Sequence, residues 1–377
     1  MSTLANKFFV TVMAAATPVV PAMAQANSSS VHGKISLPAN SPVSLLSADW
    51  GDSGVQARGG AVMLDVRLSL QLRNEDRGRR IRGVTLAVLS QSSTAVGGKA
   101  SITVPTLDVG PGEAFPVRWN LQLLRPMQNG SGGPDVEVTL DGVLFDNLSF
   151  FGPDQLKSRR TMTVWELESR RDRKYFRALL DSGGVEGLRA AIVDAAQRQQ
   201  DRPKVGVSMA RGARVTNTET ERKVEFAFLK MPESPVEVVS GVAQVSGNEA
   251  VVPRIEIRNK SDRAVQHLEL GLIMRDRQGR EFLAGSAPAD PSLAPGQKAH
   301  VSQETVLRFP PSTAVEGMSG VVTSVEFGDG QVWVPSRAAL NADPKLRAVM
   351  PPSPEEQRLL QLYQKRGIQA VIDELKR

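Results

Sequence analysis

Two Asp-Ser-Gly segments, residues 52–54 and 181–183, are the stretches of this 377-residue sequence that most resemble catalytic motifs. Aspartic proteases need two such carboxylates within hydrogen-bond reach of each other, because one shared proton activates the attacking water. Each motif must then lie on a loop between strands. Asp181 falls in a stretch that predicts a helix, and Asp52 has no equivalent in the internal repeat of the chain. The two segments therefore do not form a protease dyad.

A serine nucleophile of the trypsin type would need a histidine base that a buried aspartate orients. The chain has only three histidines, His32, His267 and His300, and no cysteine. No pair of these histidines has the spacing of metal ligands, and the lack of cysteine excludes the common structural zinc patterns. The sequence thus predicts no catalytic, cofactor-binding or metal-binding residue, and a protein that is not an enzyme.

Four aspartates fall at expected turns, where a carboxylate more often closes an Asx-turn than binds calcium. They are Asp141, Asp146, Asp276 and Asp329. No phosphate-cradling glycine loop or dinucleotide fingerprint is present either. We therefore expect these side chains to stabilise turns.

The overall composition is that of an ordinary folded protein, with 41% hydrophobic and 23% charged residues. Aromatic residues make up only 5%, which argues against a surface that stacks sugars or bases. The basic residues are mostly arginine and are spread along the chain. The net charge of +6 therefore indicates solvated faces rather than a nucleic-acid partner.

The N-terminus is typical of a signal peptide. Lys7 precedes an apolar run over residues 8–20, and small residues at 22 and 24 offer a cleavage site after Ala24. Thirteen apolar residues are too few to span a bilayer, and no later segment is apolar enough to do so. The lack of cysteine after the run excludes a lipoprotein anchor. We expect a periplasmic or secreted protein without disulfides, whose cores alone supply stability.

An internal repeat extends through most of the chain. Ser41-Pro42-Val43 returns as Ser234-Pro235-Val236, an offset of 193, and Asn74 returns as Asn259, an offset of 185. Further matches at offsets near 182 align Phe151 with Trp333, and matches at 180 align Leu179-Leu180 with Leu359-Leu360. Because the order is kept throughout, the chain is a tandem duplication. The first change of offset places a loop of eight extra residues in copy one, around residues 51–60.

Each copy shows the alternation of strands, bounded by turn residues. Residues 62–72 alternate apolar and polar side chains over eleven positions, and residues 254–258 do the same in copy two. Residues 276–279 and 327–331 predict hairpin turns in which glycine supplies the positive φ. Several short strands of this kind indicate an immunoglobulin-like β-sandwich of about 100 residues.

Copy two resembles the FxLYD-like, immunoglobulin-like domains of exported bacterial proteins. The residues that carry the resemblance are Asn259-Lys260-Ser261, Val265, Leu268-Glu269-Leu270, residues 276–279 and residues 293–297. The resemblance covers more than half of copy two. In copy one Asn74-Glu75-Asp76 replaces the Asn-x-Ser turn, so the resemblance is weaker there. Turn and core positions imply a fold and leave function open.

Each predicted sandwich is followed by helix. Residues 166–200 predict two helices broken near Gly183-Gly184, and residues 354–377 predict a second pair broken at Gly367, with Ser353 as the N-cap. The apolar residues of the second pair lie at helical spacing. We expect each helical hairpin to pack on its own sandwich, and the alternative is a helix that binds a partner.

The predicted fold is mainly β with helical appendages: two tandem immunoglobulin-like β-sandwiches, each followed by a helical hairpin. The predicted segments are a signal peptide (1–24), a flexible N-terminus (25–40), copy one (41–153), a helical segment (154–202), a strand-containing connector (203–233), copy two (234–335) and a helical C-terminal segment (336–377).

The predicted function is that of an exported, non-enzymatic binding or scaffold protein of the bacterial envelope, whose tandem modules contact another protein. The alternative is an envelope assembly factor or chaperone, or an enzyme with an interdomain site. The candidate binding residues lie in the extra loop of copy one, because duplicated modules specialise through unmatched loops. They are Asp52, Ser53, Val55, Gln56 and Arg58.

Overall fold

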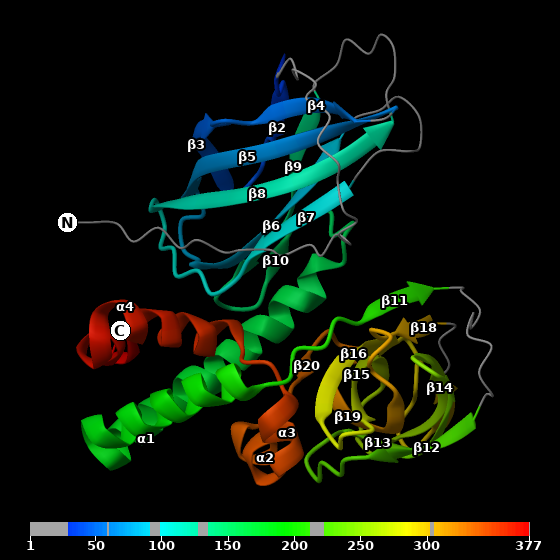
Figure 1. Cartoon of the computed structure of the whole chain (residues 1–377). Helices are drawn as coiled ribbons and strands as arrows, with labels where there is room; N and C mark the ends of the chain where they lie inside the picture. The colour runs from blue at the N-terminus through cyan, green and yellow to red at the C-terminus, as the bar shows by residue number, and fades with distance from the viewer. Residues whose placement is uncertain are drawn as a thin grey trace. The chain divides into compact units, whose positions relative to one another are not determined.

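The computed structural model describes residues 29–58, 60–90, 99–126, 135–211, 222–301 and 305–376. The predicted signal peptide therefore lies outside the described residues. The protein is mainly β, with 45% strand and 26% helix, which confirms the predicted class (Figure 1). The chain divides into two compact units, Met1–Glu166 and Leu167–Arg377.

Two five-stranded sheets make up the β part of the first unit. The first sheet has the order β1-β4-β5-β3, with β8 on the other edge of β5, and the second has the order β10-β9-β6-β7, with β2 also paired to β9. The strands are β1 (Ser29–Ser30), β2 (Gly33–Ser36), β3 (Val43–Asp49), β4 (Gly54–Arg58), β5 (Ala61–Asn74), β6 (Ile81–Ser90), β7 (Lys99–Val104), β8 (Ala114–Pro126), β9 (Val136–Phe145) and β10 (Phe150–Phe151).

One hydrophobic core joins the two sheets. Alternate residues of β5 are buried, among them Leu64, Leu68 and Leu72, as the period-two pattern predicts. They belong to the same core cluster as Leu86 of β6 and Val138 of β9. The inner faces of both sheets therefore contribute to a single core.

The β part of the second unit is one ten-stranded sheet with the order β11-β18-β14-β13-β12-β19-β15-β16, and with β17 on β14 and β20 on β19. The strands are β11 (Ser208–Arg211), β12 (Arg222–Phe228), β13 (Val236–Ser246), β14 (Glu249–Asn259), β15 (Val265–Asp276), β16 (Glu281–Ala289), β17 (Lys298–Val301), β18 (Thr305–Arg308), β19 (Val315–Phe327) and β20 (Val332–Trp333).

The strand β12 changes partner halfway along its length. Residues 222–225 pair antiparallel with β13, and residues 226–228 pair parallel with β19. In the first unit, β1 pairs with β4 and β2 pairs parallel with β9. Ser29 and Arg222 are separated by the same offset as Ser41 and Ser234, so the repeat begins near Ser29. The prediction of a flexible N-terminus over residues 25–40 is thus wrong for the strands β1 and β2.

The structure repeats other details of the sequence match. Phe151 faces Val143 across β10 and β9, and Trp333 faces Val325 across β20 and β19, at the offset that the sequence match assigns to this region. The guanidinium of Arg79 lies 3.8 Å from the centre of the Phe145 ring. That of Arg263 lies 3.9 Å from the centre of the Phe327 ring. Equivalent side chains therefore make equivalent contacts in the two copies.

The extra residues of copy one do not form a loop. They lengthen a β-hairpin: β3, β4 and β5 extend from residue 43 to 74, whereas the equivalent β13 and β14 extend from 236 to 259. The segment predicted as the loop contains β4, which pairs with β5 from Gly54 to Arg58. The inserted residues could extend both strands of the hairpin, because pairing between the strands satisfies the hydrogen-bonding groups of the inserted backbone.

The helix α1 (Ser158–Asp201) follows the first β part and crosses into the second unit, and α4 (Pro354–Lys376) ends the chain. Gly184 (φ 61°) and Gly367 (φ 75°) interrupt them, which confirms both predicted breaks. Ser353 Oγ accepts a hydrogen bond from the Glu356 amide and caps α4 as predicted. When Gly184 is aligned with Gly367, the residue of α1 that corresponds to Leu359 is Phe176. The sequence match instead paired Leu359 with Leu179, which lies three residues, or almost one helical turn, further along α1.

Within the second unit, the two kinked helices pack on each other. Their shared cluster holds Phe176, Leu188 and Ile192 of α1 together with residues of α4, at the equivalent positions Leu359, Val371 and Leu375. No strand residue belongs to this cluster among the described residues. The expectation that each hairpin packs on its own sandwich is therefore wrong: amphipathic spacing shows that a face is buried, not which element covers it.

Two short helices lie between β20 and α4. They are α2 (Arg337–Ala342), capped by Ser336, and α3 (Pro344–Val349), capped by Asp343. Leu340 and Leu346 pack in a small core with Ile273 and Val321 of the sheet. No helix in the described part of the chain is both long and apolar enough to cross a membrane.

Candidate functional site

The strand β13 has an open edge where β12 leaves it. Its pairing with β12 ends at Val242, and among the described residues no strand pairs with that edge over residues 237–241. At the start of the strand, the Ser234 hydroxyl accepts from the Val236 amide at 3.3 Å and donates to the Val236 carbonyl at 2.7 Å. A short stretch of backbone donors and acceptors therefore faces outward.

A groove of about 620 Å³ lies along this open edge, which we call the β13 groove. Its lining is formed by residues from β12, β13 and β19, by the segment between β12 and β13, and by the residue after β14: Phe226, Phe228, Leu229, Lys230, Met231, Pro232, Ser234, Val236, Glu237, Val238, Val239, Ser240, Gly241, Val242, Lys260, Val321 and Val322. The two phenylalanine rings meet edge to face, 4.4 Å apart. The volume and the mainly apolar lining are those of a binding site.

Gly320 is needed for the floor of the β13 groove. A Cβ atom there would lie 2.7 Å from Phe226 Cε1 and 2.9 Å from Phe228 Cε1. Gly241 is almost as tight against Phe228, at 3.1 Å. The two aromatic rings of β12 can therefore lie against neighbouring strands only because both positions lack a side chain.

Both copies keep a β-bulge with an exposed aliphatic residue on this edge. The register shifts between Val238 and Ser240 in β13, and between Leu45 and Ser47 in β3. The bulged residues are equivalent in the repeat: Val239 is 44% exposed and Leu46 is 42% exposed. Bulges re-aim side chains near binding sites and also twist an edge away from unwanted partners.

The residues predicted as a binding loop lie elsewhere, at the turn before β4 and in β4 itself. Asp52 is in the turn, with its carboxylate 4.0 Å from the Arg67 guanidinium. Ser53 Oγ accepts from the Arg67 amide at 2.8 Å. Val55 packs on the first core, whereas Gln56 is exposed. The backbone of Arg58 pairs with Ala61, and its side chain lies outside the described atoms. Partner binding at these residues stays a prediction.

Three of the four aspartates expected at turns are found there. Asp276 accepts from the amides of Gln278 and Arg280, and Asp329 accepts from the Gln331 amide. Asp146 also lies in a turn.

Asp141 is the exception, since it lies in the middle of β9, whereas Asp276 ends β15 and closes the turn that follows. Asp141 Oδ2 accepts from the Ser158 hydroxyl at 2.6 Å, so it stabilises the start of α1. Within the described residues, no three acidic or histidine side chains group as metal ligands would.

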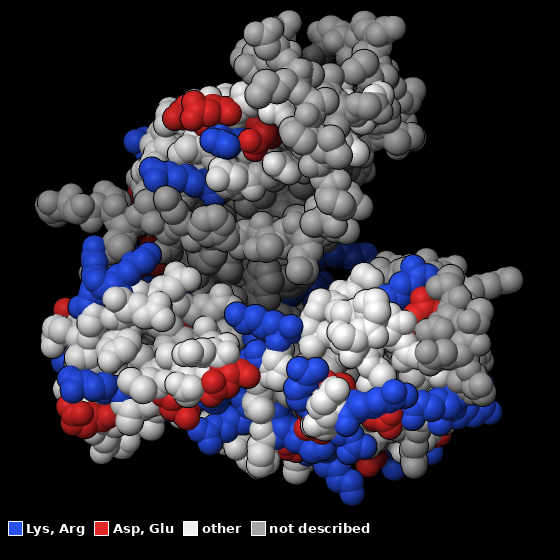
Figure 2. Space-filling view, viewed as in Figure 1, with Lys and Arg blue, Asp and Glu red and all other residues white. Residues whose placement is uncertain are grey.

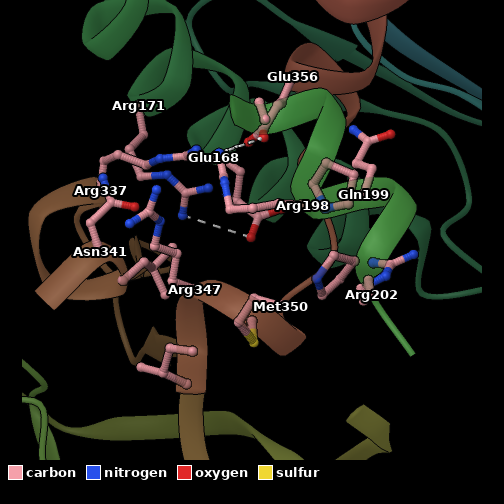
Figure 3. A pocket seen from close by; sticks show the side chains of 15 residues that line it. Glu168, Arg171, Arg198, Gln199, Arg202, Arg337, Asn341, Arg347, Met350 and Glu356 are labelled. Carbon is pink, nitrogen blue, oxygen red and sulfur yellow. Dashed lines mark hydrogen bonds and ion pairs between the residues drawn. The ribbon is translucent and has the colours of Figure 1, made fainter. Parts of the chain in front are cut away.

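A second pocket, in the helical part of the second unit, is lined by five arginines: Arg171, Arg198, Arg202, Arg337 and Arg347 (Figure 3). We call it the arginine pocket. It is small, about 30 Å³, and its remaining charged residues are Glu168 and Glu356. The side chains come from α1, α2, α3 and the first turn of α4. Figure 3 shows Arg171, Arg337 and Arg347 close together on one side of the pocket.

Buried carboxylates hold these arginines in place. Asp172, which is fully buried, accepts from Arg171 Nε at 2.8 Å and from its Nη2 at 3.1 Å. Glu356 lies 2.6 Å from Arg337 Nη1 and 3.5 Å from Arg198 Nη2. Because buried ions need partners, this network fixes how α1, α2 and α4 meet.

Asp194 pairs with two of these arginines, Arg198 and Arg347. Its carboxylate lies 3.1 Å from Arg198 Nε and 2.7 Å from Arg347 Nη2. Partial burial alone would raise the pKa of Asp194, but the hydrogen bonds and charges of the two guanidinium groups hold it below its ordinary value.

Glu168 has the opposite shift. Burial raises its pKa from 4.5 to about 7, because the charged form is poorly solvated; Arg171 opposes the rise, and Asp172 and Glu269 add to it. Arg171 Nη1 lies 3.9 Å from Glu168 Oε1. Glu168 is therefore only partly ionised near neutral pH.

Two buried donors at the arginine pocket lack a hydrogen-bond partner: Arg337 Nε and Gln199 Nε2. Buried donors without partners are uncommon in folded proteins. Sequence reasoning missed this pocket because its members extend from residue 168 to 356 and no short motif joins them. The only signal in the sequence was the many arginines of residues 167–202.

Comparison with known proteins adds no assignment. No family model and no curated protein sequence matches the chain. Among solved structures, a β-glucosidase from Kluyveromyces marxianus matches 73% of this chain and 45% of its own, at 9% identity and a TM-score of 0.16. Red sea bream transglutaminase matches 75% and 31%, at 9% identity and a TM-score of 0.14. The chain spans less than half the length of either protein, and scores this low carry no argument.

Proposed function

We propose that the protein is an exported, non-enzymatic binding or scaffold protein of the bacterial envelope, built from two immunoglobulin-like modules that contact a protein partner. The partner supplies an extended segment with aliphatic side chains, which adds to the open edge of β13. The single observation that carries the proposal is the β13 groove, an apolar groove along an unpaired strand edge.

Binding by addition of a strand suits both the unpaired edge and the apolar lining of the β13 groove. Main-chain hydrogen bonds to residues 237–241 supply affinity, and the apolar lining accepts alternate side chains of the added strand. Val239 and Val242 are 44% and 49% exposed on the rim, so their burial against a partner removes apolar surface from water. In copy one, Leu46 is the residue equivalent to Val239, which supports a role for this edge in both modules.

The experiment selects binding peptides from a displayed library of extended segments, using the chain from Gln25 onward, and measures their affinity by calorimetry. We expect the double variant Val239→Asp/Val242→Asp to bind a selected peptide at least tenfold more weakly. Val193→Asp is the matched control, because Val193 is 50% exposed on α1 and does not line the groove. The peptide is then used to find the natural partner in an envelope extract.

Hydrogen exchange locates the binding site independently of the variants. Bound peptide should slow exchange of the amides within residues 237–241, since strand addition protects backbone donors. Protection confined to other strands, or affinity unchanged in the double variant, would contradict the proposal. A selected peptide whose binding is lost on deletion of residues 51–58 would instead favour the turn and strand predicted from sequence.

A further inference from the structure

The arginine pocket carries more positive charge than its acidic neighbours neutralise. Five arginines line it, whereas four carboxylates, those of Glu168, Asp172, Asp194 and Glu356, pair with or face them. The surplus is one positive charge when Glu168 is ionised, and two when it is protonated. Such a surplus in a partly enclosed site attracts an anion, because charges interact more strongly there than in bulk water.

Two of the arginines, Arg337 and Arg347, have N–H donors that are not fully used by the surrounding carboxylates. Arg337 Nη1 faces both Glu356 and Asp172, yet its buried Nε has no hydrogen-bond partner. For Arg347 the structure shows one ion pair, to Asp194, and leaves its side chain 48% exposed at the pocket mouth. Guanidinium groups with free N–H donors bind carboxylates and phosphates in a bidentate manner.

We propose that the arginine pocket binds the oxyanion group of a ligand, a phosphate or a carboxylate, between Arg337, Arg347 and Arg198. The space of about 30 Å³ admits a compact group rather than a whole organic molecule, so the rest of the ligand extends into solvent past Arg347. This site is separate from the β13 groove: the two linings share no residue. The binding of an anion therefore does not depend on the proposed peptide binding.

The test titrates the protein with inorganic phosphate, sulfate and acetate by calorimetry at constant ionic strength. We expect saturable binding of one anion per chain, and at least tenfold weaker binding in Arg347→Ala. Arg189→Ala is the matched control: it removes an arginine of α1 that pairs with Glu186 and does not line the pocket, so its affinity should equal that of the unmodified protein. Phosphate and sulfate binding without acetate binding identifies a phosphate-type ligand, and the reverse identifies a carboxylate.

Sulfate provides a second readout, because it does not titrate between pH 6 and pH 8. Glu168 faces the site with Arg171 beside it and Asp172 and Glu269 nearby, and it loses its proton over this range. Sulfate should therefore bind several-fold more weakly at pH 8 than at pH 6, and Glu168→Gln should remove most of that difference. No saturable binding of any of the three anions, or equal affinity in Arg347→Ala and the unmodified protein, overturns the proposal.

Discussion

Asn74 and Asn259 hold the same turn in the two repeats, and both side chains are fully buried. Each amide nitrogen donates to two backbone carbonyls, and each amide oxygen accepts from the backbone two residues further along. The carbonyls belong to Arg79 and Val109 in the first repeat and to Arg263 and Leu293 in the second. One side chain thus ties a strand end to two neighbouring segments in each module.

Replacing either asparagine should destabilise its own unit. Asn74→Ala and Asn259→Ala each remove two donated hydrogen bonds and one hydrogen bond accepted from the backbone by a buried amide, and we expect a loss of about 2–4 kcal/mol in the free energy of unfolding. Urea denaturation followed by circular dichroism measures the loss, and hydrogen exchange assigns it to a unit. Asn120→Ala, at an exposed position of β8, is the control and should cost less than about 0.5 kcal/mol. If Asn259→Ala lowered the free energy of unfolding by no more than the control does, the hydrogen bonds of Asn259 would not stabilise the fold.

The glycines that interrupt the helices should resist substitution even though they are not crowded. Gly184 has φ 61° and ψ −159°, and Gly367 has φ 75° and ψ −176°, a region that other residues rarely occupy. We expect Gly184→Ala and Gly367→Ala to cost about 1–3 kcal/mol each. Gly183→Ala is the matched control, because Gly183 has no positive φ and equal space; it should be neutral or stabilise the helix. Thermal unfolding of the three variants distinguishes strain from crowding.

Glu168 should make the stability of the second unit depend on pH. Its folded pKa of about 7 lies above the ordinary 4.5, so ionisation opposes folding. The penalty is absent below pH 4.5, grows as the pH rises to 7 and is complete above 7. Glu168→Gln should therefore stabilise the protein at pH 8, by on the order of 1–3 kcal/mol, and much less at pH 5. Glu186→Gln, at a side chain 78% exposed, is the control; an equal gain at both pH values for Glu168→Gln would disprove the titration.

The packing of α1 against α4 should make the stability effects of substitutions in their shared core non-additive. Ile192 and Leu375 are equivalent positions of the two copies, are fully buried and share one cluster. Each change to alanine should cost about 2–4 kcal/mol. The double variant should cost less than their sum, because the two changes open neighbouring space in the same core. Val193→Ala, at an exposed position of α1, serves as the control. Strictly additive costs would argue that the two helices unfold independently.

Features set by local periodicity could be predicted from the sequence. The alternation in residues 62–72 and the Ser353-Pro354 helix start need only neighbouring residues to act, and both were found. The helical breaks near Gly184 and at Gly367 follow likewise from backbone freedom. Matching the two copies also placed Trp333 and Phe151 correctly on their strands.

Features that depend on distant segments could not be predicted in this way. The eight extra residues of copy one lengthen a hairpin, and only the register of β4 on β5 shows this. Asp141 accepts from the hydroxyl of Ser158, where a helix begins 17 residues later, so its position beside an expected turn was misleading. The arginine pocket joins four helices, and the β13 groove exists because β12 leaves β13 to pair with β19. Figure 2 shows basic and acidic side chains interspersed on the viewed face, so charge pattern alone did not indicate either site.

The shared helical cluster has a consequence for the origin of the chain. Phe176, Leu188 and Ile192 of one copy are covered by the equivalent residues of the other. A single ancestral copy would have exposed that face, unless two identical chains covered each other about a twofold axis. Duplication within one gene would then have turned a contact between subunits into one within a chain, where the tether keeps the effective concentration high. On this view the protein is a homodimer made permanent by covalent fusion.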